Sequence, residues 1–135
     1  ASKRMPSSVS PVPARVEVEV LVVEAFAAAG PSDARLEPLL PTLKGMGFGS
    51  FALLERIPMR LADGQASKMK LAEGRELTVE ALSHDTQQAR VRLALRSGAV
   101  SLVDTTVTVH RNKAFYLAVR GPGGRTFILP VAVRY

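Results

Sequence analysis

Basic side chains alternate with apolar ones along several stretches of this sequence, and they are its best candidates for binding a ligand. In the clearest stretch, Arg90 and Arg92 flank Val91. Alternation puts the two kinds of residue on opposite faces of a β-strand, so one face suits a core and the other suits water or an anion. The same spacing recurs, and we predict a basic sheet face that binds an anion or a partner through Arg56, Arg60, Lys68, Lys70, Arg90 and Arg92.

Aromatic residues do not accompany these bases. Folds that bind single-stranded nucleic acid stack the bases on exposed aromatic rings. Here Phe51 alternates into the expected core, and the other relevant rings lie near the C-terminal hairpin, at Phe115, Tyr116 and Phe127. A face that follows the phosphates of a nucleic acid, or an acidic polymer, stays open as an interpretation. A surface that reads bases is not expected.

No catalytic or metal-binding arrangement is recognisable. The chain has no cysteine, which excludes disulfides, thiolate metal sites and cysteine nucleophiles. His84 and His110 lack the spacing of metal ligands or of a catalytic triad, and we predict that both lie on the surface. Glu17 and Glu19 share a strand face, where such a pair more often meets solvent or an arginine across the sheet than performs acid–base chemistry. We therefore expect a non-enzymatic protein without cofactor or metal.

Two glycine-rich stretches are interpreted as structural. The spacing Gly45-x-Gly47-x-Gly49 does not match a dinucleotide-binding loop, and the Lys-Ser/Thr of a P-loop is absent. We interpret Gly45–Gly49 as the C-cap of a helix followed by a flexible connection. The glycines after Arg120 supply the positive φ of a tight turn, and we expect Arg125 at its tip to be solvated.

Short stretches of apolar alternation, separated by turn residues every 8 to 12 positions, predict most of the secondary structure. A short helix, irregular because of Pro38 and Pro41, is expected between an N-cap at Ser32 or Asp33 and Gly45. Tight hairpins are expected at Glu73-Gly74 and Asn112-Lys113. The predicted strands are Arg15–Val23, Ser50–Leu61, Gln65–Leu71, Arg75–Leu82, Gln88–Ser97, Ser101–His110, Ala114–Arg120 and Thr126–Tyr135. The fold class is mainly β, an antiparallel sandwich or barrel of about seven or eight strands with one short helix near the N-terminus.

Composition divides the chain into two parts. Residues 1–14 contain four serines and three prolines and are predicted to be a flexible leader, whereas residues 15–135 are predicted to form a single β-rich domain. The net charge is +6, and residues 50–135 carry thirteen bases against seven acids. Such an excess favours anionic partners and also promotes solubility. No apolar run reaches the roughly 20 residues of a membrane-spanning helix.

Several motifs along Arg15–Tyr135 carry a resemblance. After the opening strand and the proline-broken helix come Phe48-Gly-Ser-Phe-Ala-Leu-Leu, Leu71-Ala-Glu-Gly-Arg-Glu-Leu, Arg90-Val-Arg-Leu, Leu102-Val-Asp-Thr-Thr-Val and Phe127-Ile-Leu-Pro-Val. In this pattern the chain resembles a small β-domain of exported bacterial proteins whose function is poorly defined. The resemblance implies an extracytoplasmic β-domain, and it implies no catalytic residues.

These observations lead to two functional hypotheses. The first is a structural or protein-interaction module of a bacterial cell-envelope or secretion assembly, in which an exposed sheet edge pairs with a strand of a protein partner. The alternative is a β-domain that binds nucleic acid or an acidic polymer through the basic face. The Ser/Pro-rich leader favours a periplasmic location, although a cytoplasmic one stays open, and a signal peptide or lipobox upstream of Ala1 would decide between them.

Overall fold

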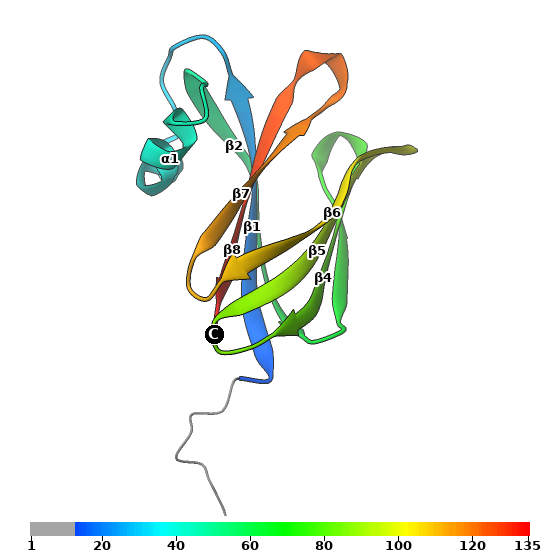
Figure 1. Cartoon of the computed structure of the whole chain (residues 1–135). Coiled ribbons are helices and arrows are strands. Elements are labelled where there is room, and N and C mark those ends of the chain that lie inside the picture. Colours follow the sequence, from blue (N-terminus) through cyan, green and yellow to red (C-terminus); the bar gives the residue numbers. More distant parts are fainter. Residues whose placement is uncertain (1–12) are drawn as a thin grey trace, which may run out of the picture.

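The computed structural model describes residues 13–135, which form eight strands and a short helical segment (Figure 1). Ala34–Leu39 (η1, a 3-10 turn) and Leu40–Lys44 (α1) make up the helical segment. Single 3-10 turns, η2 (Ala72–Gly74) and η3 (Pro122–Gly124), lie between strands. The strands are β1 (Arg15–Phe26), β2 (Ser50–Ala62), β3 (Ala66–Lys70), β4 (Arg75–His84), β5 (Gln88–Ser97), β6 (Val100–His110), β7 (Ala114–Arg120) and β8 (Thr126–Arg134).

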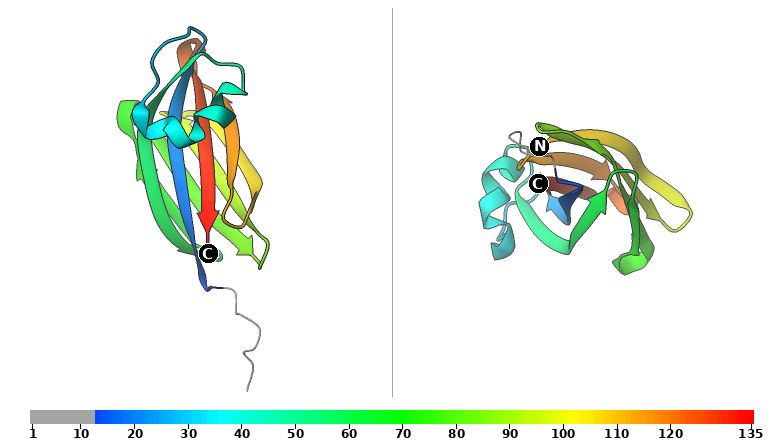
Figure 2. Two further views of the ribbon diagram at one scale, coloured as in Figure 1. Left: turned by 90° about the vertical axis from the view of Figure 1, so that its left-hand side faces the viewer. Right: turned by 90° about the horizontal axis from the view of Figure 1, so that it is seen from below.

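The strands form two four-stranded antiparallel sheets that face each other as a sandwich (Figure 2). The first sheet has the order β2-β1-β8-β7, and the second has the order β3-β4-β5-β6. The chain crosses between the sheets twice, from β2 to β3 and from β6 to β7. Both crossings lie beside Arg15 and Arg134, and we call this the crossing end. At the far end, beside Phe26, the turns each join two strands of the same sheet.

One expected hairpin is a crossing instead. The turn at Asn112-Lys113 is tight, with Asn112 at a φ of 59°. However, β6 pairs with β5 and β7 pairs with β8, so the strands on either side of this turn belong to different sheets. The prediction of a paired hairpin there was wrong because turn residues fix a chain reversal but not the sheet that the next strand joins. The turn at Glu73-Gly74 does join the paired strands β3 and β4.

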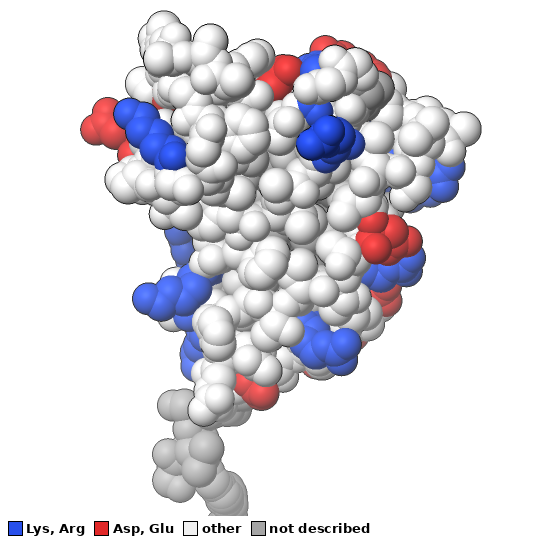
Figure 3. Space-filling model, turned by 45° about the horizontal axis from the view of Figure 1, so that its top comes forward, with Lys and Arg blue, Asp and Glu red and all other residues white. Residues whose placement is uncertain are grey.

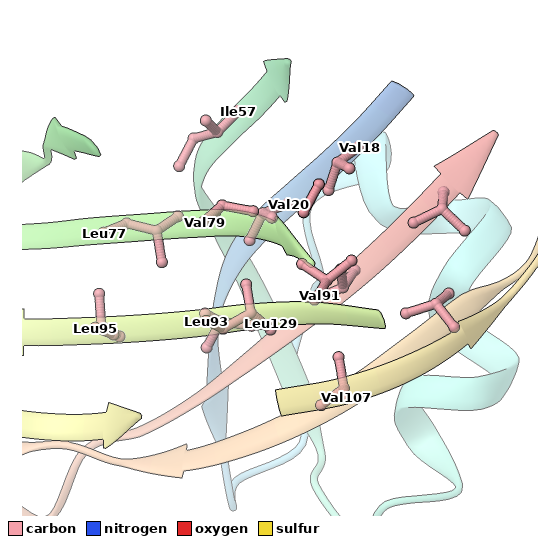
Figure 4. Packing of buried hydrophobic residues seen from close by; sticks show 14 of the residues in the cluster. Val18, Val20, Ile57, Leu77, Val79, Val91, Leu93, Leu95, Val107 and Leu129 are labelled. Carbon is pink, nitrogen blue, oxygen red and sulfur yellow. The ribbon is translucent and has the colours of Figure 1, made fainter. Parts of the chain in front are cut away.

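The main core lies between the sheets and consists of the alternating apolar residues of each strand (Figure 4). Val16, Val18, Val20 and Val22 of β1 are at most 1% exposed. On β5, Val91, Leu93 and Leu95 are fully buried, whereas the arginines between and after them face outward. The two-residue period of a strand therefore produces one dry face per sheet, as the sequence predicts.

A second apolar cluster forms where the helical segment covers the outer face of the first sheet near the far end (Figure 2). Leu36 and Leu43 are fully buried there against Val23, Phe51 and Ile128. The Asp33 carboxylate accepts a hydrogen bond from the backbone N–H of Arg35 at 2.9 Å and so caps the segment, as predicted.

The prolines shape this helical segment in different ways. Pro38 lies inside the 3-10 turn, whereas Pro41 stands in the first turn of α1, where no intrahelical N–H bond is lost. Pro41 therefore begins a helix rather than disrupting one. α1 ends at the Gly45 C-cap, as expected. No helix among residues 13–135 is long and apolar enough to cross a membrane.

Core truncation tests this packing. Leu93 is fully buried between the sheets, so we expect Leu93→Ala to lower the free energy of unfolding by about 3 kcal/mol. Val100 is 62% exposed, and Val100→Ala, the control, should change it by less than about 0.5 kcal/mol. Urea denaturation followed by circular dichroism measures both. Equal effects of the two substitutions would contradict the assignment of Leu93 to the core.

Candidate functional site

The six bases predicted to form one basic face lie on two different sheets. Arg56 and Arg60 belong to β2 in the first sheet. Lys68 and Lys70 lie on β3, and Arg90 and Arg92 on β5, both in the second sheet and separated by β4. The structure therefore brings four of the six to one face and places the other two on a separate sheet.

On the outer face of the second sheet, carboxylates stand among these bases. Glu76 of β4 lies 3.5 Å from Lys68, and Glu80 lies 4.0 Å from Arg92. Asp104 of β6 accepts two hydrogen bonds from Arg92, at 2.9 and 2.7 Å. The hydrogen bonds from the Arg92 guanidinium lower the pKa of the Asp104 carboxyl below its usual value. Much of the basic charge on this face is therefore already balanced by neighbouring acids.

The outer face of the first sheet also mixes both signs of charge. Arg56 donates a hydrogen bond to Glu19 at 2.8 Å. Glu17 stands in register with Arg60 on one side and Arg134 on the other. A shallow hollow of about 370 Å³ lies over these residues, so its rim contains both carboxylates and arginines. The two glutamates thus face arginines across the sheet, as the spacing suggested, and form no isolated acidic pair.

An ionic cluster at the far end joins the two sheets. Arg125, before β8, donates two hydrogen bonds of 2.9 Å to Glu24 and one of 2.7 Å to Glu73. Arg75 also donates to Glu73 at 2.7 Å, and both guanidiniums lie over the Phe127 ring, 5.2 and 4.9 Å from its centre. The hydrogen bonds from Arg125 and Arg75 lower the pKa of Glu73. Arg125 is therefore a structural residue, and the expectation of a solvated tip was wrong.

The two histidines differ from each other. His110 is exposed, as predicted. The side chain of His84 is 5% exposed and is hydrogen-bonded at the crossing end, so the expectation that it lies on the surface was wrong. Among residues 13–135, no group of three His, Asp or Glu side chains is placed to hold a metal ion.

β6 and β7 diverge with distance from the turn that joins them (Figure 1). A hollow of about 400 Å³ lies near the far end and is lined by residues of both sheets, and Val100 beside it is 62% exposed. The face shown in Figure 3 carries uncharged side chains over its middle, with charged side chains of both signs around them. We call this hollow the β6/β7 opening; it is lined by Ser97, Val100, Ser101, Leu102, Arg120 and Gly121.

The edge strands on the two sides of the sandwich differ in how they are protected. On one side, β3 is five residues long and carries Lys68 and Lys70, and its neighbour β2 carries Pro58. Short length, lysine and proline all discourage pairing with a further strand. On the other side, β6 has eleven residues and β7 has seven, and neither contains lysine or proline. The edges at the β6/β7 opening therefore lack these two kinds of protecting residue, although Asp104 and Arg120 place charges on them.

Polyanion binding tests the predicted basic face. Because Arg56, Lys68 and Arg92 already contact carboxylates, we expect a mobility-shift assay with a short DNA duplex to show weak binding that is lost by about 0.15 M salt. Arg90→Glu with Arg92→Glu should reduce it no more than Arg56→Glu with Arg60→Glu, the matched pair on the first sheet. DNA binding that persists at higher salt, and that only the double substitution on β5 abolishes, would contradict this expectation and favour the anion-binding alternative.

Comparisons with known proteins leave the functional prediction open. No protein-family model, no curated protein and no solved structure matches this chain. The resemblance to a small exported bacterial β-domain stays a prediction, and so does binding through the six bases. What the structure adds to the sequence is the β6/β7 opening, which depends on the separation of two strands that are neighbours in the chain.

Proposed function

We propose that this protein is a non-enzymatic interaction module that binds an extended segment of a protein partner at the β6/β7 opening. The observation that supports the proposal is the contrast between the two sides of the sandwich. One side carries Pro58, Lys68 and Lys70, which discourage strand pairing, whereas β6 and β7 contain neither lysine nor proline.

The backbone of these edges supplies the binding chemistry. β6 and β7 are the last strands of their sheets, so each has a row of N–H and C=O groups that no other strand pairs. An added strand satisfies such groups along its whole length, and its alternate side chains point toward the same face. Apolar residues at those positions would reach the hollow beside Val100 and Leu102.

Charge at the opening favours an acidic residue in the partner segment. Arg120 lines the hollow, and it has no ion-pair partner among residues 13–135. The outward-facing Arg96 donates a hydrogen bond to the carbonyl of Ala99 in the adjoining turn. The partner segment is therefore apolar at alternate positions and carries an aspartate or glutamate where it passes Arg120.

The cellular setting remains part of the proposal. The Ser/Pro-rich composition of residues 1–14 and the resemblance to exported bacterial domains support a cell-envelope or secretion assembly. Residues 1–12 of that leader lie outside the described part of the chain. The anion-binding alternative is less favoured because the six bases are divided between two sheets and partly paired.

Selection from a random peptide library tests the proposal. Twelve-residue peptides displayed on phage would be selected against the whole chain, and we expect enrichment of sequences with alternating apolar residues and one acid. Val100→Lys puts a charge at the opening and should abolish their binding. Ala66→Lys, an exposed position on the protected β3 edge, is the matched control and should leave binding intact.

Three results would overturn the proposal. The first is that enriched peptides bind Val100→Lys as well as the unmodified chain, and the second is that they are acidic without any alternation. The third is a dimer in sedimentation that is lost in Val100→Lys; the occupant of the edge would then be a second copy of the chain rather than a partner.

A further inference from the structure

The ring of His84 is enclosed at the crossing end, where three separate parts of the chain meet. His84 is the last residue of β4, and its side chain is 5% exposed. Around it lie Pro13, just before β1, Asp63 in the crossing from β2 to β3, and Tyr135 after β8. The ring therefore links the segment that enters the domain to strand ends from both sheets.

Both nitrogens of the His84 ring contact oxygen atoms. Nδ1 lies 2.6 Å from Oδ1 of Asp63, and Nε2 lies 2.6 Å from the backbone carbonyl oxygen of Pro13. Neither oxygen can donate a proton when Asp63 is ionised, so both bonds require an N–H on the ring. A neutral imidazole carries one N–H, whereas the imidazolium carries two. The observed geometry is therefore that of the protonated ring, and loss of the proton must break one of the two contacts.

The groups packed around the His84 ring shift its pKa in both directions. Burial lowers the pKa of His84, but the hydrogen bonds to Pro13 and Asp63 and the charges of Asp63 and Asp85 raise it, and the net shift is upward from the ordinary value. Tyr135 presents its ring at a 76° angle, 5.1 Å between centres, and Arg111 lies over that ring at 4.8 Å. These are the titratable and charged groups that face His84 from the β2–β3, β4–β5 and β6–β7 turns and from the end of β8.

We propose that protonated His84 is a clamp that fastens Pro13 to the crossing end, and that the clamp opens as the pH rises. When the ring is neutral, the N–H stays with the carboxylate of Asp63, because a charged acceptor binds an N–H more strongly than a carbonyl does. The contact that breaks is therefore the one with Pro13. Protonation thus controls how firmly the residues before β1 are held against the strand ends. The clamp is at the opposite end of the sandwich from the β6/β7 opening and does not depend on the proposed function.

The direction of the pH effect follows from the raised pKa. A histidine whose pKa is higher in the folded than in the unfolded chain stabilises the fold fully at a pH below its unfolded value. That contribution disappears as the pH rises through the folded value. We therefore expect the clamp to be closed at about pH 5.5 and open at about pH 8.5.

Carbonyl-detected NMR of the whole 135-residue chain tests the clamp. The side-chain resonances of His84 give its pKa, which should lie above the ordinary histidine value. The Pro13 carbonyl resonance should shift with the same midpoint, and the carbonyl relaxation of Pro13 and Ala14 should become that of a more mobile segment at high pH. A His84 pKa at or below the ordinary value, or a Pro13 carbonyl that does not follow its titration, would overturn the proposal. Both measurements use the unmodified chain, so a loss of folding in a variant does not affect them.

Three substitutions separate the clamp from general pH effects. His84→Gln should remove the pH response of Pro13, whereas His110→Gln, the control at an exposed histidine, should keep it. Asp63→Asn removes the charged acceptor at Nδ1 and should lower the His84 pKa measurably. A Pro13 response that persists in His84→Gln would show that another group controls it and would sink the clamp.

Discussion

The fold depends on the position of the two chain crossings between its sheets. Both crossings, from β2 to β3 and from β6 to β7, lie at the end where β1 begins and β8 finishes. Covalent connections therefore hold the sheets together at that end only. Elsewhere the sheets stay together because their inner faces, built largely from valine and leucine, exclude water. At the far end the Arg125 side chain links the two sheets, because it donates hydrogen bonds to Glu24 of one sheet and to Glu73 beside the other.

The same constraint explains why the sandwich opens where it does. The ionic cluster holds the far end around β1, β4 and β8, and Phe127 packs under both of its guanidiniums. β6 and β7 are the last strands of their sheets, and they start from one turn (Figure 1). With distance from that turn the two strands separate, and the hollow beside Val100 results. The opening thus lies between two edge strands that the side-chain bonds of the far-end cluster, in the described part of the chain, do not link to each other.

The strands and the helix could be predicted well from the sequence because they depend on local features. Contacts between residues far apart in the chain could not. The alternation of Val16, Val18 and Val20 depends on one strand alone, so the strands and the mainly β class could be read directly. Which sheet a strand joins is not local: the turn at Asn112 looks the same whether it joins paired strands or crosses the sandwich. The predicted basic face was divided for this reason. His84 and Arg125 were misjudged as solvated because their partners lie 71 and 101 residues away along the chain.

Edge protection is informative because it has no role inside an isolated, folded domain. A lysine or proline on an edge strand adds little to the stability of its own sheet, and its effect is to prevent association with other chains. Such residues on β2 and β3 protect one side of the sandwich against pairing with another chain. Such residues are absent from β6, which is rich in valine and threonine, and from β7, so this side is the less protected of the two. An edge without this protection favours association with another strand, and an exposed Arg120 at that edge, in a chain of net charge +6, is the reason for proposing an occupant that carries a carboxylate.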